Sequence, residues 1–303
     1  MSEFKSTNIP QQVSPAEAPV DTVVNTLQQT LDIIKDQLEI TDSRVGEFLI
    51  YKNDQVISQA IKLFGEYCHA EVTIMSRYLT ENSCMLDIGT NIGYHAVGVH
   101  KQTNCQVIGF EPNPKHFAVA SYNSRGSEKI QIINGAASNK KQTFLMKDFD
   151  PGVESNYGDI HKTDIDGQIE VQAITIDSCT LNRCQFMKID VEGHELEALE
   201  GSKKTISKYR PVIMFEAMEW DVWTACYNFL DERKYKHYWV ACRTRPVDET
   251  YKKTDMNPFG NSTVSNILAV PAERDQPNDL LPVTNYESFS TCFERYRKLK
   301  ILF

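Results

Sequence analysis

Between residues 84 and 137, short apolar runs alternate with helix-like stretches, and this alternation constrains the fold more than any other feature of the chain. The strand-like runs are CMLDIG, CQVIGFEP and IQIINGAA, and the stretches between them are YHAVGVHK and PKHFAVASYNS. The gaps are too short for anything except crossover helices, which is typical of βαβ units. The sequence therefore predicts an α/β fold with a doubly wound, mostly parallel sheet.

A second set of runs extends this pattern toward the C-terminus. QFMKID and PVIMFEA predict two strands, GHELEALEGSKKTISK predicts the helix between them, and another helix is expected near residues 220–233. The runs YKHYWVACR and TVSNILAVP fit a closing antiparallel hairpin with a long connection. Between the two sets, TFLMK and QIEVQAITID predict strands on either side of a long polar loop at residues 150–167.

The region before the first strand divides into two parts. Residues 1–20 are rich in Ser, Pro, Gln and Ala, which predicts a disordered arm. Apolar residues then recur at helical spacing from Val24 to Leu38, so we expect an amphipathic helix that packs on the main domain or pairs with another copy in a homodimer. A second helical stretch runs from about residue 54 to 79. These patterns predict a helical extension over residues 21–82, a main domain over 83–275 and a C-terminal tail over 276–303.

Charge and cysteine usage exclude several classes of function. The chain has 32 basic and 41 acidic residues and a formal net charge of -9, which disfavours binding to a nucleic-acid backbone. It has no apolar run of bilayer length, no signal-peptide pattern and no CxxC pair among its eight cysteines. We therefore expect a soluble cytoplasmic protein with reduced thiols, and neither a membrane nor a nucleic acid as partner.

The run MLDIGTNIGY places a glycine-flanked turn directly after the first strand of the sheet, where a doubly wound fold binds its ligand. A dinucleotide loop has a central glycine there, to admit the pyrophosphate, but this turn has Asn91. S-adenosylmethionine has no pyrophosphate, and its amino-acid tail can lie against such a turn. Taken alone, the turn is as compatible with a purely structural role as with ligand binding. Asp87 before it, and Glu111 at the end of the next strand to accept the ribose hydroxyls, favour the nucleoside ligand.

The run MKIDVEGHELEALEG indicates where chemistry takes place. Lys188, Asp190 and Glu192 fall on one side of a strand, which is costly unless they line a cleft. Glu216 ends the neighbouring strand, about 5 Å from Asp190, and two such acids can share a proton, orient a hydroxyl or hold a divalent metal. Alternatively, the acids after the strand are partners of a helix dipole. His194 has a pKa suited to a general base, although a structural or substrate-contacting role suits a lone histidine at a helix start better.

Taken together, these motifs resemble those of FkbM-type S-adenosylmethionine-dependent methyltransferases. The resemblance covers residues 66 to 271 and rests on DIGTNIG, FEPNP, NGAAS, ITID, KIDVEGHELEALEG, VIMFE and SNILAVP. It implies a class I methyltransferase fold with a seven-stranded sheet, and O-methylation of a small metabolite, often a sugar of a glycan or a polyketide. The cofactor would be S-adenosylmethionine and the product S-adenosylhomocysteine.

The resemblance also implies roles for single residues. The methionine end of the cofactor would be lined by Asp87, Gly89, Asn91 and Gly93, the ribose would bind Glu111 beside Pro112, and the adenine edge would meet Ala136. The residues that would face the transferred methyl group and the acceptor are Asp190, Glu192, His194 and Glu216. Asp190 would also border the cofactor. Thr90 departs from the family, which usually has alanine there.

Other functions stay open from the sequence. A non-catalytic protein that binds S-adenosylmethionine or a nucleoside would be expected to lose the acids at the strand tips, which this chain retains. A nicotinamide-dependent reductase is opposed by Asn91 and the missing third glycine of its motif. Methylation of a protein or peptide nitrogen is disfavoured, because no tetrapeptide of the Asn-Pro-Pro-Tyr type follows the fourth predicted strand. The acceptor is expected to contact residues 148–167 and 243–262, whose polarity suits a sugar; whether a divalent metal is held by Asp190 and Glu216 is undecided.

Overall fold

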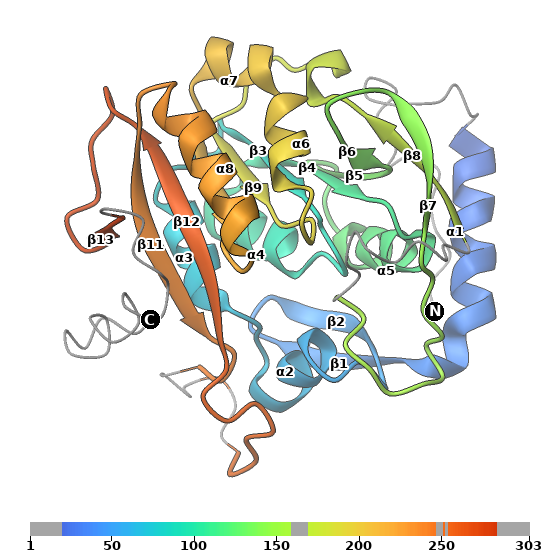
Figure 1. Ribbon diagram of the computed structural model, residues 1–303. Coiled ribbons are helices and arrows are strands. Elements are labelled where there is room, and N and C mark those ends of the chain that lie inside the picture. Colours follow the sequence, from blue (N-terminus) through green and yellow to red (C-terminus); the bar gives the residue numbers. More distant parts are fainter. Residues whose placement is uncertain (1–19, 159–168, 247–250, 252–253, 284–303) are drawn as a thin grey trace.

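The computed structural model describes residues 20–158, 169–246, 251 and 254–283. Its centre is a sheet in which the described strands follow the order β13-β11-β12-β10-β9-β3-β4-β5 (Figure 1). The strands are β3 (Cys84–Ile88), β4 (Gln106–Glu111), β5 (Ile130–Asn134), β9 (Phe186–Ile189), β10 (Val212–Glu216), β11 (Tyr235–Arg243), β12 (Thr263–Pro271) and β13 (Leu281–Pro282).

The directions of these strands confirm the predicted topology. β5, β4, β3, β9 and β10 are parallel neighbours, whereas β12 runs antiparallel between β10 and β11. This is a doubly wound, mostly parallel sheet with an antiparallel final hairpin. The structure differs from the expected seven strands by the two-residue β13, which pairs with β11 at the edge and is too short to produce a recognisable pattern in sequence.

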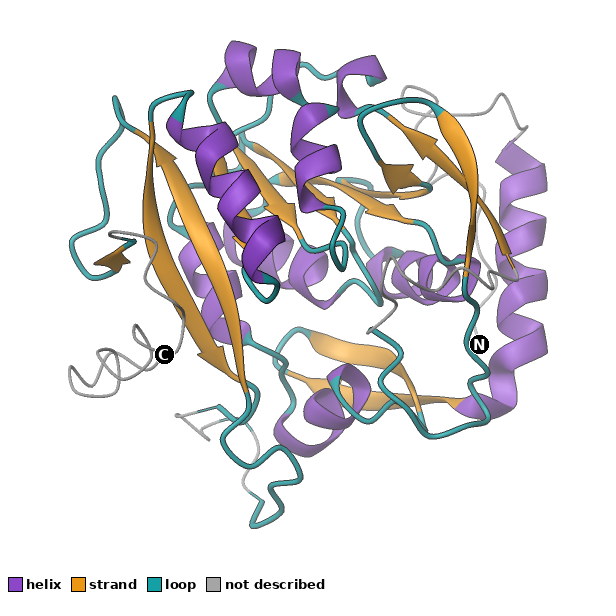
Figure 2. Ribbon diagram, viewed as in Figure 1, coloured by secondary structure: helices purple, strands orange, loops and turns teal. Residues whose placement is uncertain are grey.

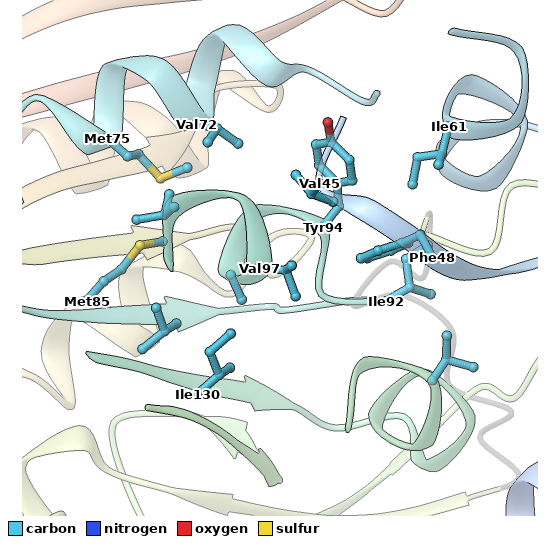
Figure 3. Packing of buried hydrophobic residues seen from close by; sticks show 14 of the residues in the cluster. Val45, Phe48, Ile61, Val72, Met75, Met85, Ile92, Tyr94, Val97 and Ile130 are labelled. Atoms are coloured by element: carbon cyan, nitrogen blue, oxygen red, sulfur yellow. The ribbon is translucent and has the colours of Figure 1, made fainter. Parts of the chain in front are cut away.

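Helices cover both faces of the sheet (Figure 2). One face packs against α3 (His69–Ser76), α4 (Tyr94–Thr103) and α5 (Pro114–Ser124), and the other against α6 (Glu195–Glu200), α7 (Lys203–Tyr209) and α8 (Trp220–Asp231). Figure 3 shows the first core, where Met85 and Ile130 of the strands lie near Val97 of α4. Leu86, the next residue of β3, belongs to the other core. The two-residue period of buried strands therefore divides the apolar side chains between two cores.

Two local signals determine where helices begin and end beside the sheet. The Asn113 side chain accepts hydrogen bonds from the backbone N–H groups of Lys115 and His116, with Pro114 in the first turn, so α5 begins directly after β4. The single helix predicted over residues 193–208 is wrong, because α6 and α7 are separate: the chain leaves the helical conformation at Ser202, with φ -112° and ψ 10°. At Gly201 before it, a Cβ would lie 2.0 Å from the carbonyl oxygen of Ser138, so the close approach of the two backbone segments requires glycine.

The N-terminal extension holds helices, as expected, together with a hairpin that the sequence reading missed. It comprises α1 (Val20–Ile34), a 3-10 turn (Lys35–Gln37), β1 (Leu38–Ser43), β2 (Gly46–Tyr51), α2 (Ile57–Phe64) and α3. The predicted first helix ends four residues early, because Leu38 begins β1. Leu27, Leu31 and Ile34 are buried, and α1 contacts α5, so the helix docks on the main domain. Its pairing in a homodimer stays a prediction.

The two β-rich runs after β5 form a small second sheet with the order β6-β8-β7. Its strands are β6 (Ala136–Ala137), β7 (Gln142–Met146) and β8 (Ile169–Ile174). The predicted arm at residues 1–20 lies outside the described residues except for residue 20, as do residues 159–168 of the polar loop and 284–303 of the tail. Among the described helices, none is long and apolar enough to cross a membrane.

Candidate active site

A cavity of about 630 Å³ lies beyond the carboxyl ends of the parallel strands. It is bounded by the loop after β3, the start of α5, β7 and the N-terminal extension, which lies below these strand ends in Figure 1. The cavity brings together nine of the candidate site residues: Gly89, Asn91, Glu111, Pro112, Ala136, Asp190, Glu192, His194 and Glu216. Residues far apart in sequence therefore meet, because parallel strands place their carboxyl ends along one edge.

The remaining two candidates, Asp87 and Gly93, lie behind the cavity wall. Asp87 is 1% exposed within β3, directly across from Lys188 of β9. Neither of its carboxylate oxygens has a hydrogen-bond partner among the described residues, and burial raises its pKa to about 6 despite the opposing charge of Lys188. Gly93 begins α4 with φ +88° and packs against Ala120 of α5. Both act on the site through the shape of the loop and through charge.

The loop after β3 requires glycine at its first position. Gly89 has φ +87°, and a Cβ there would lie 1.7 Å from the carbonyl oxygen of Asp190, so no side chain fits. Asn91 has φ 52°, a left-handed conformation that asparagine tolerates. Its side chain turns back on the loop, where Oδ1 accepts a hydrogen bond from the Ile92 N–H at 2.8 Å. The loop is therefore a tight backbone cradle in which Asn91 stabilises the turn.

Glu111 links this loop to the start of α5. Its Oε2 accepts a hydrogen bond from the Asn91 N–H at 2.8 Å, and its Oε1 accepts one from the Asn113 N–H at 2.9 Å. Burial raises the pKa of Glu111 to about 8, although both backbone hydrogen bonds oppose the rise. Each carboxylate oxygen can accept more than one hydrogen bond. The carboxylate is thus held in place by the backbone and retains capacity for a pair of neighbouring hydroxyls.

Three carboxylates gather where β9 and β10 end. Asp190, Glu192 and Glu216 each offer an oxygen, and these oxygens all lie within 4.8 Å of one another. Burial raises the pKa of Glu216 far above its ordinary value, and the charges of Asp190 and Glu192 add to the rise. Glu192 has φ 50° and is followed by Gly193 at φ +90°, a turn that carries the chain from β9 toward α6. This cluster can share protons, orient a hydroxyl or accept a cation.

A buried lysine lies beneath this cluster. Lys188 is 2% exposed, and its Nζ is 2.6 Å from Oδ2 of Asp190. Burial alone would lower the pKa of Lys188, but the nearby charges of Asp190, Asp87 and Glu71 raise it above its ordinary value. The ammonium group therefore stays charged and holds one oxygen of Asp190. Such a buried charge is tolerated only when it is paired.

His194 lines the cavity beside the small sheet. Its ring stacks on Phe144 of β7, with the ring centroids 6.3 Å apart. Leu145 and Met218 also line the cavity, and their side chains are 60% and 63% exposed. Exposed residues therefore line the cavity at β7 and just before α8, as Lys147 and Asn156 also do.

Tyr67 and His95 are among the lining residues that the sequence did not predict. Nε2 of His95 lies 3.4 Å from Oε2 of Glu71, and Oε1 of Glu71 accepts a hydrogen bond from Nδ2 of Asn266 at 3.0 Å. Burial lowers the pKa of His95 well below its ordinary value, and burial raises the pKa of Glu71 to about 7. Tyr67 and Glu71 belong to the run FGEYCHAEV, most of which lies within the resemblance. That resemblance could have indicated these two residues.

Strand order and the glycine-flanked loop define the class I methyltransferase fold. Residues 87–239 match the model of the methyltransferase FkbM domain, which is half of the chain, and the chain belongs to this family. The match begins at Asp87 and ends within β11, so it contains the loop, Glu111 and all three clustered carboxylates.

Among characterised proteins, the chain is similar to the hexuronic acid methyltransferase AglP of Haloferax volcanii, with 30% identity over 140 residues. This match covers 44% of the chain and 56% of AglP, so the chain spans just over half of that relative. Methyltransferase FkbM from Methylobacillus flagellatus KT has a crystal structure with TM-score 0.44 and 15% identity, covering 82% of this chain and 60% of that one. The crystal structure of a precorrin-6y C5,15-methyltransferase from Geobacter metallireducens GS-15 has TM-score 0.40 and 17% identity, and the match covers 67% of this chain and 86% of that chain.

Proposed function

We propose that the chain is an S-adenosylmethionine-dependent methyltransferase that methylates a hydroxyl of a sugar, a glycan or another small metabolite. One observation carries this proposal. A tight glycine cradle, a backbone-held carboxylate and a cluster of three further carboxylates line a single cavity. Membership of the FkbM family supports methyl transfer. The sugar acid named for the relative AglP supports a carbohydrate acceptor.

The cofactor half of the proposal depends on how the residues present fit the ligand. At Gly89 a Cβ would collide with the backbone, so the loop offers only main-chain groups to the amino-acid tail. Glu111 has oxygens free for the two ribose hydroxyls, and Pro112 and Ala136 line the cavity on either side of it. S-adenosylmethionine would supply a methyl group on a positively charged sulfur. The nearby carboxylate of Asp190 would favour that charge.

The acceptor half depends on proton transfer. A hydroxyl that takes up a methyl group must lose its proton, and a general base within hydrogen-bond reach contributes about 10²–10⁴-fold to such a reaction. Asp190, fixed by Lys188, is the carboxylate best placed to accept that proton, with Glu192 and Glu216 orienting the hydroxyl. His194 and Phe144 would contact the acceptor. The same three acids form an oxygen-only donor set that suits Mg²⁺, which would supply a Lewis acid.

A transfer assay tests this function. The protein is incubated with S-adenosylmethionine labelled in the methyl group and with a panel of acceptors: neutral monosaccharides, hexuronic acids, oligosaccharides and a lysine- and glutamine-containing peptide. We expect label on a carbohydrate oxygen and none on the peptide, and parallel reactions with Mg²⁺ or a chelator test the cation. Label on a peptide nitrogen would replace the proposed acceptor. Cofactor binding without transfer to any acceptor would favour a non-catalytic binding protein.

A further inference from the structure

Residues 148–158, which we call the strap, cross from the end of β7 to the N-terminal extension (Figure 1). Asn156, Tyr157 and Gly158 of the strap line the cavity. At Gly158 a Cβ would lie 3.4 Å from Nδ2 of Asn91 and 3.5 Å from Cδ1 of Ile57. The strap therefore lies directly against the glycine-flanked loop, whose Asn91 N–H is bonded to Glu111.

Asp54 of the extension connects the strap to the rest of the molecule. It is 5% exposed, and its Oδ1 accepts hydrogen bonds from the Val56 N–H at 3.2 Å and the Tyr157 N–H at 3.4 Å. Its Oδ2 accepts one from the Ser58 N–H at 2.7 Å. One carboxylate thus organises the start of α2 and binds the strap. The bond to the Tyr157 N–H is long, but its acceptor is a carboxylate that the N–H groups of Val56 and Ser58 hold in place.

Backbone contacts beside Asp54 extend this connection. The Ser155 N–H donates to the carbonyl of Asn53 at 3.3 Å, and the Gln55 N–H donates to the carbonyl of Ser155 at 2.9 Å. Nδ2 of Asn53 donates to the carbonyl of Pro151 at 3.0 Å. The strap is therefore joined to residues 53–55 by polar contacts of the backbone and of Asn53, none of which involves a strand of the central sheet.

Aromatic rings attach the other side of the strap to α5. Tyr157 stacks on Phe149 with centroids 4.5 Å apart, and Phe149 stacks on His116 at 4.7 Å. The ring of Tyr51 meets all three edge-on. Nε2 of His116 lies 3.0 Å from the carbonyl oxygen of Tyr157, and burial lowers the pKa of His116 to about 4, so the neutral ring donates this hydrogen bond. His116 follows closely on Glu111, which joins the strap to the ribose end.

We infer that Asp54 is a positioning residue that holds the strap closed over the cofactor, and that the strap opens to admit S-adenosylmethionine and to release S-adenosylhomocysteine. This inference rests on the proposed function, because it assigns the part of the cavity beside the strap to the cofactor. The acceptor enters separately, beside the exposed Leu145 and Met218. A change at Asp54 therefore alters the exchange of cofactor and leaves the acceptor's entrance intact.

The test measures the dissociation rate of S-adenosylhomocysteine by stopped-flow displacement for wild type, Asp54→Ala, Asp54→Asn and the control Asp42→Ala. Asp42 is an exposed acid of β1 in the same extension, and its replacement should leave the rate unchanged. We expect dissociation about tenfold faster in Asp54→Ala, the change expected when roughly 1.4 kcal/mol of binding is lost. Asp54→Asn keeps one acceptor oxygen, so its dissociation rate should lie between the rates of wild type and Asp54→Ala. The KM for the acceptor should change less than the dissociation rate.

A second variant covers the case in which Asp54→Ala does not fold. Asn53→Ala removes only the side-chain bond to Pro151 and should also speed dissociation, by a smaller factor. Wild-type dissociation rates in every folded Asp54 and Asn53 variant would overturn the strap's role while leaving the proposed function standing. If wild-type protein failed to bind S-adenosylhomocysteine at all, the proposed function would fail, and this inference with it.

Discussion

Two parts of the cavity are built differently. In the proposed cofactor site, the decisive features are main-chain geometry: Gly89 against the carbonyl of Asp190, and Glu111 held by the N–H groups of Asn91 and Asn113. In the proposed acceptor site, the decisive features are side chains: three clustered carboxylates and the exposed Leu145 and Met218. A site that depends on backbone geometry tolerates few residues. A site formed by side chains on loops can change its substrate without changing the fold.

The largest expected effect comes from Gly89→Ala. A non-glycine residue at positive φ costs about 1–2 kcal/mol, and here the added Cβ also collides with the Asp190 carbonyl oxygen. The collision moves the loop or the end of β9, so cofactor binding should be lost and the melting temperature should fall. Calorimetry and thermal denaturation measure the two effects.

Gly126→Ala is the matched control for this change, because a Cβ at Gly126 has no heavy atom within 4 Å. It should bind cofactor as wild type does. If Gly89→Ala bound equally well, the loop would not be the rigid cradle described above.

Asp190→Asn should separate the two parts of the cavity. The substitution removes the proposed base and leaves the buried ammonium of Lys188 without its carboxylate partner. We expect kcat to fall by about 10²–10⁴-fold, with a modest loss of cofactor affinity. Steady-state kinetics on the labelled acceptor, with calorimetry on the same samples, measure both quantities. The exposed Asp221 of α8 provides an Asp221→Asn control, and near-normal turnover in Asp190→Asn would make this acid structural.

Glu111→Ala should mainly weaken cofactor binding, whereas Asp190→Asn should mainly lower turnover. Glu111→Ala removes the proposed ribose acceptor and leaves the N–H groups of Asn91 and Asn113 without their partner. Each lost hydrogen bond to a ribose hydroxyl is worth about 0.5–1.5 kcal/mol, so losing two should raise the Kd for S-adenosylmethionine roughly 10- to 100-fold with the fold intact. Calorimetric titration measures the change, and unaltered affinity would exclude Glu111 from the ribose site.

The smallest expected effect is a dependence of stability on pH. Burial raises the pKa of Glu111 from 4.5 to about 8, so the folded protein binds more protons than the unfolded chain between these values. The free energy of unfolding therefore falls as pH rises through this window, with a slope of at most about 1.4 kcal/mol per pH unit. Buried histidines such as His116 act in the opposite sense, but only below their unfolded value of 6.5.

The measurement for this prediction is the melting temperature of ligand-free protein between pH 6.5 and 8. Wild type should lose stability across this range, whereas Glu111→Gln, which cannot ionise, should show a flatter profile. Equal slopes for the two proteins would assign the pH dependence to other groups, such as Glu71, whose pKa burial raises to about 7.

The central sheet could be predicted from sequence because buried parallel strands produce continuous apolar runs that alternate with helices. The same alternation placed Asp190 and Glu216 on neighbouring strand tips, and the structure brings their oxygens to within 4.8 Å. Because the end of a strand can be recognised from the local sequence, the pattern was enough to predict these site residues.

Other features depend on contacts that a local pattern does not contain. Leu38 fits the spacing of the preceding helix and yet begins β1, because the hairpin is determined by packing and by Gly46 at φ +100°. The close approach of the Ser138 backbone to Gly201 is such a contact. The strap bonds to Asp54, more than ninety residues earlier in the chain, and lies against Asn91 of the loop after β3. The contact of residues 148–167 with the acceptor stays a prediction.

The most direct test of the central claim is a calorimetric titration of the purified protein with S-adenosylmethionine and S-adenosylhomocysteine, with NADH as the control ligand and with or without Mg²⁺. The cradle at Gly89 and the carboxylate of Glu111 predict micromolar binding of both sulfur ligands and none of NADH. Binding of NADH, with neither sulfur ligand bound, would contradict the assignment of the loop after β3 and the methyltransferase function built on it.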